Sequence, residues 1–439
     1  SSDLNLMLIE PALARAQILD CCRHQYREGD VMHWWHRHPA GDRGVRTMCS
    51  DDLIWLIWAL CEYTEAMGDL ALCKTEQPFL QSEPLREEER DRYETPVQSA
   101  ETASVLDHAL RALSLVETRG FGPHALPWMG SGDWNDGLDR AGGESVWLGW
   151  FVSCCTLRFS ELLERMDDPR AGHYRALSEQ LGRAADTCFN GRWYLRAFQH
   201  DGSALGDGER IDSLAQSWAA FCPWATPEKV DLALDSALDR LVDWEHGVVK
   251  LLAPPYTSED SPGYLSGYGE GFRENGGQYT HAAVWLALAL LQSGEYGIRD
   301  VPMIHACVNG SDVCDSFNDL IVYKQTFSGV TRISIAIDGQ SAGDLRGDGI
   351  IVATAVGATG YSLSSGGPIL ADGLNATVVT PICAHTLHFR PVVVSTESVI
   401  EMTMHDVGSL ASDGDRIVSL HEGDRITVSR SKLTVRLLT

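Results

Sequence analysis

The loop Gly130–Gly137 is the clearest candidate for chemistry, because it sets two carboxylates three positions apart around a tryptophan. The acids are Asp133 and Asp136, and Trp134 lies between them. Positioned carboxylates donate or accept protons in general acid–base catalysis. The same residues also suit a polar turn, since an Asp-Gly pair is common in turns and Asp133 can act as a cap. The spacing alone leaves both interpretations open.

Several other segments combine aromatic rings with hydrogen-bonding groups. Aromatic faces pack on sugar rings, and carboxylates, amides and guanidinium groups hydrogen-bond to sugar hydroxyls. Together these segments favour a carbohydrate cleft. They are His33–His36, Arg46, Ser50–Asp52, Asp212–Trp218 and Arg273–His281.

The elements that must position these residues are mostly helices. Apolar residues recur at steps of three and four in seven segments, which indicates amphipathic helices. Long loops such as Leu126–Gly143 and Leu251–Gly277 lie between them and are the usual place for a site on a helical scaffold. The pattern favours a large all-α barrel or solenoid. The expected helices are Asp51–Met67, Ser99–Glu117, Ser145–Met166, Tyr174–Cys188, Ile211–Phe221, Pro227–Leu241 and Gln278–Leu291.

The character of the chain changes near Tyr296–Val301. All thirteen tryptophans lie between Trp34 and Trp285, and none follows. Beyond the junction the apolar period falls to two, which is typical of strands. This part therefore predicts an antiparallel β-domain. The alternating runs are Ile333–Ile337, Arg425–Val428 and Leu433–Leu437.

Composition excludes some classes of protein. The net charge of −26 over 439 residues disfavours nucleic-acid and anionic-membrane partners. No apolar run approaches the roughly 20 residues of a membrane span. Twelve cysteines without CxxC spacing favour reduced thiols in the cytoplasm. The start at Ser1, without an initiator Met, is typical of an excised piece.

The first segment resembles glycoside hydrolase family 94, and is nearest to the phosphorylase-like module of cyclic β-1,2-glucan synthases and to related β-glucan phosphorylases. The resemblance implies an (α/α)6 barrel that converts a β-glucoside and phosphate reversibly into α-glucose 1-phosphate. The motifs that carry it are His33–His36, Gly44–Thr47 with Ser50–Leu53, Gly132–Gly137, Glu144–Trp150, Ile211–Trp218 and Glu274–His281.

The same resemblance implies the roles of the site residues. Asp136 matches the single proton donor, and apolar surroundings that include Trp134 are expected to raise its pKa. Phosphate is already an anion, so no base is needed, and phosphate is a substrate rather than a cofactor. Arg273 and His281 match the phosphate-binding residues. The substrate-binding positions are Asp133, Trp134, His33, Trp34, Trp35, Arg46, Asp51, Asp52, Gln216 and Glu274.

Structural interpretations of some of these residues stay open. His33, His36 and His281 are also compatible with packing roles, and Arg273 with an ion pair. Zinc binding by His33, His36 and His38 is not expected, because no Cys or carboxylate lies beside them at ligand spacing. No metal is therefore predicted.

The last segment resembles the carboxy-terminal domain of NAD kinases. The motifs are Phe317–Leu320, Gly347–Pro368 and Thr380–His385 followed by Arg390-Pro391. The resemblance implies an NAD site. The family's Gly-Gly-Asp-Gly motif occurs nowhere in the sequence. The cofactor-binding positions are Asn318, Asp319, Asp348, Thr359, Tyr361 and Ser364.

We therefore expect a multidomain chain. Residues 1–298 would be a family-94-like domain truncated at both ends, and residues 302–439 an NAD-kinase-like β-domain without the amino-terminal α/β half. The expected partners are a β-glucan oligosaccharide, phosphate and NAD, and association into a homo-oligomer stays open. The alternatives are ATP-dependent NAD phosphorylation, or a fusion that binds sugar and dinucleotide without turnover.

Overall fold

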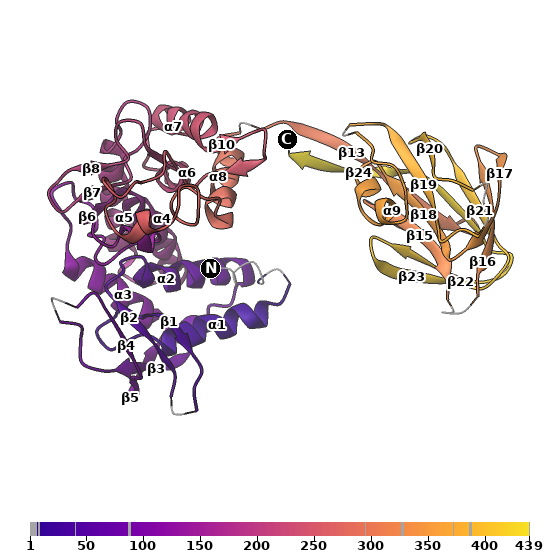
Figure 1. Ribbon diagram of the computed structural model, residues 1–439. Coiled ribbons are helices and arrows are strands. Elements are labelled where there is room, and N and C mark those ends of the chain that lie inside the picture. Colours follow the sequence, from indigo (N-terminus) through magenta and orange to yellow (C-terminus); the bar gives the residue numbers. More distant parts are fainter. Residues whose placement is uncertain are drawn as a thin grey trace. The chain divides into compact units, whose positions relative to one another are not determined.

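The structure is a computed structural model of the chain. It describes residues 7, 9–39, 41–86, 89–294, 296–325, 329–371, 373–385 and 389–438. The chain divides into two compact units, Ser1–Glu295 and Tyr296–Thr439. Figure 1 follows the chain through both units.

The first unit is built around a series of apolar helices. Helices α2, α4, α6 and α8 pack against one another in chain order, and α1, α3, α5 and α7 each pack on one or two of them. The alternate helices are amphipathic, so each buries one face. The helices are α1 Pro11–Arg23, α2 Asp52–Met67, α3 Val105–Arg119, α4 Val146–Arg165, α5 Ala171–Thr187, α6 Ser213–Phe221, α7 Pro227–Leu241 and α8 Thr280–Ser293, with 3-10 helices η2 Leu72–Lys74, η3 Asp136–Leu138 and η4 Tyr264–Gly267.

The expectation that this unit is all-α is not confirmed, because short strands connect the helices. They form antiparallel sheets in the orders β1-β2-β4, β3-β5, β6-β7-β8, β12-β9 and β10-β11. All but one are only two to six residues long, and some pairings, such as β6 with β7, join segments far apart in the sequence. The strands are β1 Met32–His36, β2 Arg43–Thr47, β3 Glu76–Gln81, β4 Asp91–Glu94, β5 Val97–Ser104, β6 Gly142–Ser145, β7 Ala197–Gln199, β8 Ala204–Leu205, β9 Ile211–Asp212, β10 Val242–Asp243, β11 Val248–Val249 and β12 Leu252–Ala253.

Most of the helices predicted from periodicity are present, with one clear error at α3. This helix begins at Val105 rather than Ser99, and the residues before it form β5. The cause is the Ser104 side chain, which accepts a hydrogen bond from the Asp107 N–H and so starts the helix there. Helix α1 was not predicted.

Helix α4 is the apolar centre of the first unit. Trp147 and Trp150 on α4 are fully buried, and Trp218 on α6 is almost fully buried. Among the described residues, α4 is the one helix with the length and apolar character of a membrane span, although no such run was expected. Of its apolar window, 83% is buried inside the protein, as in the core helix of a folded domain.

The second unit consists of two six-stranded antiparallel sheets. Their orders are β14-β13-β24-β21-β16-β17 and β20-β19-β18-β15-β22-β23. Side chains from both sheets form one apolar core, for example Ile333 and Val428 from the first and Leu320 and Ile350 from the second. The antiparallel β-domain expected from the alternating pattern is confirmed.

The long strand β24 covers both of the last alternating runs. It pairs with β13 along most of its length. The elements of this unit are β13 Ile298–Val308, β14 Ser311–Ser316, β15 Asp319–Lys324, β16 Thr331–Ile337, β17 Gln340–Gly347, β18 Gly349–Thr354, η5 Gly357–Thr359, α9 Tyr361–Ser364, β19 Ala376–Ile382, β20 Val392–Ser395, β21 Ile400–Met404, β22 Gly408–Ser412, β23 Asp415–Leu420 and β24 Arg425–Leu438.

Candidate functional site

The loop Gly130–Gly137 is fixed against the segment that follows β2. Gly130 has a φ of 69°, and a Cβ there would lie 2.0 Å from the Met48 carbonyl oxygen, so only glycine fits. The Ser131 hydroxyl accepts a hydrogen bond from the Met48 N–H at 3.1 Å. The Ser50 N–H donates to the Gly132 carbonyl at 3.0 Å. These contacts bring the loop to the start of α2.

Asp133 is held inside the protein rather than in a cleft. Its carboxylate is fully buried and accepts two hydrogen bonds from Arg196, at 2.6 and 2.7 Å. The Ser145 hydroxyl donates a third at 2.7 Å. Asp133, for which a sugar-binding role is predicted, thus contacts Arg196 and Ser145, and these contacts position the loop.

Asp136 lies at the surface beside a histidine. The His33 Nε2 atom on β1 lies 3.5 Å from Asp136 Oδ2, and 45% of the Asp136 side chain is exposed. The other ring nitrogen, His33 Nδ1, lies 3.0 Å from the carboxylate of Asp52, the first residue of α2. The structure thus brings together His33, Asp52 and Asp136, which are far apart in sequence.

The two carboxylates hold His33 in its charged form. Asp136 raises the pKa of His33 most and Asp52 next, to about 11 in all, although burial opposes them. The Thr47 hydroxyl donates to Asp52 at 2.9 Å and so orients this carboxylate. The exposure of Asp136 differs from the apolar surroundings expected for it.

Trp134 packs on the start of α8. Its ring centroid lies 5.3 Å from that of Tyr279, 5.9 Å from Trp285 and 6.2 Å from His281, all nearly edge-on. His281 is exposed in the first turn of α8. The aromatic ring therefore links the carboxylate loop to the predicted phosphate-binding end.

Glu274 and Arg273 lie just before α8. The Tyr279 hydroxyl donates to Glu274 Oε1 at 2.6 Å. The Oε2 atom of Glu274 is buried and accepts no hydrogen bond within the described residues, although Arg273 Nε lies 3.4 Å away. Arg273 is 61% exposed, and its guanidinium lies 4.6 Å from the Tyr268 ring centroid. Both the ion pair and the ligand-binding interpretation of Arg273 remain compatible with this geometry.

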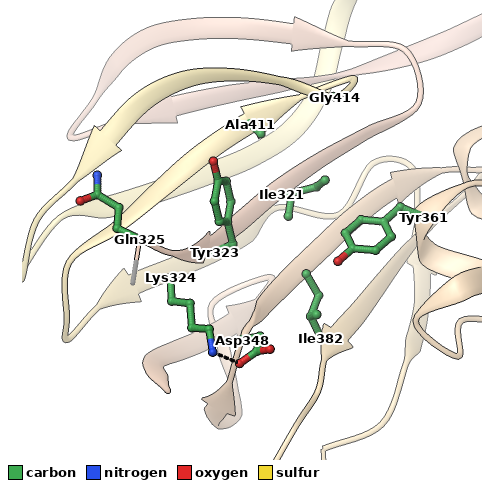
Figure 2. Close-up of a pocket in the computed structure, with 9 residues that line it drawn as sticks. All are labelled: Ile321, Tyr323, Lys324, Gln325, Asp348, Tyr361, Ile382, Ala411 and Gly414. Carbon is green, nitrogen blue, oxygen red and sulfur yellow. Dashed lines mark ion pairs between the residues drawn. The ribbon is translucent and has the colours of Figure 1, made fainter. Parts of the chain in front are cut away.

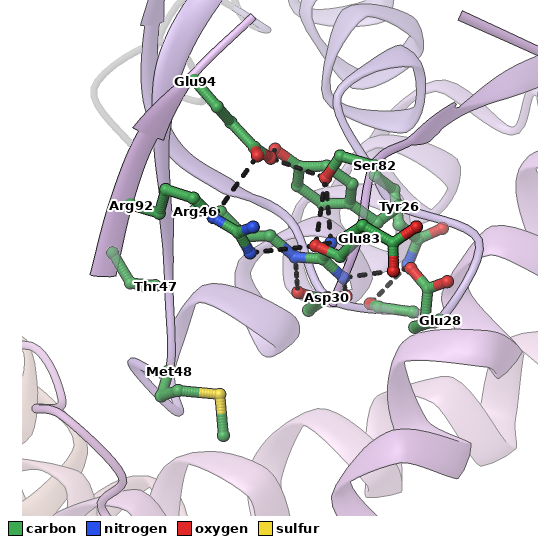
Figure 3. A network of polar contacts seen from close by, with 12 residues as sticks. Tyr26, Glu28, Asp30, Arg46, Thr47, Met48, Ser82, Glu83, Arg92 and Glu94 are labelled. Atoms are coloured by element: carbon green, nitrogen blue, oxygen red, sulfur yellow. Dashed lines mark hydrogen bonds and ion pairs between the residues drawn. The ribbon is translucent and has the colours of Figure 1, made fainter. Parts of the chain in front are cut away.

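Arg46 belongs to an internal network rather than to the loop site. Figure 3 shows its guanidinium among Glu28, Asp30 and Tyr26. It donates to both Asp30 oxygens, at 2.6 and 2.8 Å, and to Glu28 at 3.0 Å. Burial lowers the pKa of Arg46, but the acids, Asp30 first, outweigh it and raise the pKa. Only 1% of Arg46 is exposed, so it stabilises the fold here.

The other predicted sugar-binding residues divide into buried and accessible ones. The amide of the buried Gln216 forms hydrogen bonds with the backbone of Tyr194 and Asp212. The buried Asp51 accepts a hydrogen bond from Trp55 Nε1 at 2.9 Å. Burial, with Asp52 next, raises the pKa of Asp51. The remaining two, Trp34 and Trp35, alternate along β1: Trp34 is exposed, whereas Trp35 stacks on His24 at 4.0 Å.

Tyr264 is a site residue that the sequence did not single out. Burial and then the nearby charge of Asp136 raise its pKa, and Glu274 contributes as well. It lies in η4, which packs on η3, the turn that begins at Asp136. Its place in the long loop after β12 was the only signal in the sequence.

Two cavities adjoin this region. One of about 860 Å³ lies between α2, α4, α6 and α8 and is lined by His281, Trp55, Trp218 and Trp285 among others. A second of about 260 Å³ lies between α1, β1 and α2 and is lined by His33, Trp35 and Asp52 among others. The loop site therefore adjoins space with aromatic walls.

The second unit has its own pocket, of about 540 Å³, on the outer face of one sheet. Two predicted cofactor-binding residues line it, Asp348 and Tyr361, and Figure 2 shows them around the same space. Lys324 pairs with Asp348 at 2.5 Å. Tyr361 is 46% exposed, so its ring is available for stacking.

The other predicted residues of this unit gather at the turn after β18. A Cβ at Gly357 would lie 2.0 Å from the Asn318 carbonyl oxygen, so the turn and the Phe317–Asp319 loop are in contact. Asp413 accepts hydrogen bonds from three consecutive N–H groups of that loop, at 2.7 to 3.1 Å. The remaining two, Thr359 and Ser364, are exposed and do not line the pocket.

Comparison with known proteins identifies the two segments. Residues 2–305 match the model of the glycosyl hydrolase 94 superfamily catalytic domain, and residues 317–439 match that of the ATP-NAD kinase C-terminal domain. The chain belongs to the glycosyl hydrolase 94 superfamily, joined to an ATP-NAD kinase C-terminal domain. The resemblance predicted for both segments is confirmed.

The similar curated proteins differ for the two segments. The chain is 41% identical over 300 residues to the cyclic beta-(1,2)-glucan synthase NdvB of Rhizobium meliloti, which covers 65% of this chain and 10% of that protein. It is 37% identical over 158 residues to the NAD kinase of Moorella thermoacetica, covering 35% of this chain and 51% of that one. The NAD kinase of Ralstonia nicotianae is 43% identical over 125 residues, or 28% of this chain and 41% of that one. The chain thus spans a tenth of the first relative and about half of the second.

We predict that His33 stays doubly protonated across the neutral range. Its folded pKa is raised above the ordinary value of about 6.5. The stability that its ion pairs contribute is therefore fully present below that value and is lost as the pH rises towards about 11. Imidazole NMR of the full chain from pH 5 to 9 should show an unchanging imidazolium at His33.

His108 provides an internal control in the same spectra. Burial lowers its pKa to about 4, so it should stay neutral over that range. Asp52→Asn should lower the pKa of His33 and leave His108 unchanged. A His33 that titrates near pH 6.5 in the unaltered protein would contradict the ion pairs with Asp52 and Asp136.

Proposed function

We propose that residues 1–298 form an inverting glycoside phosphorylase domain acting on β-glucan oligosaccharides. This proposal rests on the different surroundings of the two carboxylates in the Gly130–Gly137 loop. Asp133 is bound by Arg196, whereas Asp136 is accessible. An inverting hydrolase needs a second carboxylate to activate water, but anionic phosphate attacks without one. The presence of a single accessible carboxylate, Asp136, therefore favours phosphorolysis over hydrolysis.

The proposed reaction uses Asp136 as the acid. A phosphate oxygen attacks the anomeric carbon from the face opposite the leaving oxygen. The glycosidic bond breaks as the new bond forms, and the Asp136 proton passes to the leaving oxygen. The product is α-glucose 1-phosphate, with inverted configuration.

His33 is the proposed positioning and proton-holding partner of Asp136. Asp52 accepts the His33 Nδ1–H and so directs Nε2 towards Asp136. A sugar that fills the site excludes water, and a low dielectric disfavours a buried ion pair relative to its neutral form. The shared proton then moves from His33 Nε2 to Asp136 Oδ2.

The phosphate end is proposed at the start of α8. His281 lies in its first turn, where free N–H groups and the helix dipole favour an anion. Arg273 would add a forked, charge-assisted donor pair. The buried Oε2 of Glu274 suits a sugar hydroxyl, because it accepts no hydrogen bond from the described residues.

We infer that the helices of the first unit are part of an (α/α)6 barrel with domain limits at residues 298 and 302. The packing of α2, α4, α6 and α8 in chain order, with the other helices on them, supports an inner and an outer layer.

A cytoplasmic location is supported by cysteine side chains that are mostly buried thiols in the core.

A second proposed function is NAD binding by the second unit. The pocket that holds both Asp348 and Tyr361 favours it, because an aromatic ring can stack on a nucleobase beside a carboxylate that accepts from ribose hydroxyls. We favour binding over ATP-dependent phosphorylation, since the sequence lacks the Gly-Gly-Asp-Gly motif.

We expect Asp136→Asn to abolish phosphorolysis, because an amide cannot deliver the proton. The loss should be about 10²- to 10⁴-fold, as for other general acids. Release of phosphate from α-glucose 1-phosphate in the presence of a glucosyl acceptor measures it. Asp235→Asn, at an exposed position on α7, is the matched control. Activity of Asp136→Asn within threefold or so of the unaltered chain would move the acid elsewhere.

Arg273→Ala should weaken phosphate binding more than β-glucoside binding. Loss of a charged hydrogen bond to an anion costs about 1.5–3 kcal/mol, or roughly ten- to a hundredfold in affinity. Calorimetric titration with each ligand separates this from the rival role, an ion pair with Glu274. Equal weakening of both ligands, or of neither, supports the rival.

Tyr361→Ala should weaken NAD binding by about tenfold or more, as the loss of one stacked ring does. Calorimetry with NAD on the full chain measures the change, and Tyr296→Ala, at an exposed tyrosine outside the pocket, is the control. Unchanged affinity in Tyr361→Ala would place NAD elsewhere. ATP-dependent formation of NADP by the unaltered chain would favour the kinase alternative.

A further inference from the structure

A cluster of metal-ligand side chains lies on the hairpin β13–β14, outside both proposed sites. His305 and Cys307 lie two residues apart on β13. Asp312 and Asp315 lie on β14, where they pair with Cys307 and His305. The register shifts at Cys307, which leaves Val313 without a partner in this pairing. This extra residue allows two acids three positions apart to face the same side.

The three candidate ligand atoms are already close together. His305 Nε2 lies 3.1 Å from Asp312 Oδ1, and Cys307 Sγ lies 3.2 Å from the same oxygen. All three atoms lie within 4.8 Å of one another. Zinc bonds of about 2.0–2.3 Å in a tetrahedron separate such ligand atoms by roughly 3.3–3.7 Å. Small side-chain rotations therefore suffice to admit an ion.

The surroundings also orient the histidine for a metal. Its other nitrogen, His305 Nδ1, lies 3.0 Å from Asp315 Oδ1. The Ser431 hydroxyl on β24 donates to that same oxygen at 2.5 Å. Histidines that bind metals commonly donate their second N–H to a carboxylate, which fixes the tautomer and the ring orientation. Here that contact leaves Nε2 directed at Cys307 and Asp312.

We propose that His305, Cys307 and Asp312 bind a zinc ion, with Asp315 as the residue that positions His305. One nitrogen, one sulfur and one oxygen ligand form a set that zinc accepts. Asp312 is 86% exposed, so solvent reaches the site and a water molecule completes the tetrahedron. As the Zn–S bond forms, the Cys307 thiol releases its proton to solvent.

The site is separate from the dinucleotide pocket. Strands β13 and β14 belong to one sheet of the second unit, whereas the pocket is lined by residues of the other sheet. A second group of potential ligands, His33, Cys49 and Asp52, lies in the first unit. Any binding experiment on the full chain must distinguish these two groups.

The test is a titration of the metal-free full chain with Co²⁺ and with Zn²⁺. We expect one equivalent to bind at the hairpin, with the absorption band of a thiolate-to-cobalt charge transfer. Cys307→Ser should remove the band and weaken zinc binding about tenfold or more, and Asp315→Asn should weaken it by roughly 10- to 100-fold. Cys383→Ser, at an exposed cysteine elsewhere in the second unit, is the matched control.

His33→Gln discriminates the group in the first unit, and it should leave the band unchanged. Asp312→Asn, at the most exposed ligand, provides a second test if Cys307→Ser fails to fold. Absence of the band in the unaltered chain would overturn the proposal. So would a band that persists in Cys307→Ser, or zinc affinity that neither Cys307→Ser nor Asp312→Asn lowers.

Discussion

The candidate site of the first unit depends on the buried ion pair between Asp133 and Arg196. Both side chains are almost completely buried, at 0% and 2% exposed. Burying two charges costs several kcal/mol per ion, and only good geometry and further hydrogen bonds offset this desolvation cost. Two parallel hydrogen bonds and the hydroxyl of Ser145 provide them. The pair fixes the loop at one end, so that Asp136, three residues later, is held at the surface.

Other polar side chains of the first unit are also bonded inside the protein, although Asp136 and Arg273 remain accessible. Arg46 and Arg196 both donate hydrogen bonds to buried carboxylates, and the Gln216 amide bonds to backbone groups. Ligand binding and the pairing of buried polar groups use the same residue types, because both require charge and directional hydrogen bonds. A sequence motif therefore identifies the segment that forms a site, while the partner across space decides which of its residues remain available.

The predictability of the fold follows the range of the interactions. Helix α7 was predicted with its observed bounds, because periodicity and Pro227 are local signals. Strand β5 was assigned to a helix, because its small polar residues gain their extended form from pairing with β3. Tyr264 and Arg196 were missed for the same reason, since only distant contacts bring them to the loop. The alternating strands of the second unit were recognisable because one face of each meets the shared core.

Neighbouring carboxylates with divided roles recur through the chain. Burial raises the pKa of Asp51, which is bonded to Trp55, whereas Asp52 stays engaged with His33. In the second unit Asp413 accepts three backbone N–H groups, and these bonds lower its pKa although burial opposes them. Asp319 lies close to that charge, and burial and Asp413 together raise its pKa. Two carboxylates that lie close together cannot both be buried as unpaired anions, so one of them forms hydrogen bonds or an ion pair within the protein. In the Gly130–Gly137 loop, Arg196 holds Asp133 inside the protein and Asp136 remains accessible to a ligand, which makes Asp136 the better candidate for function.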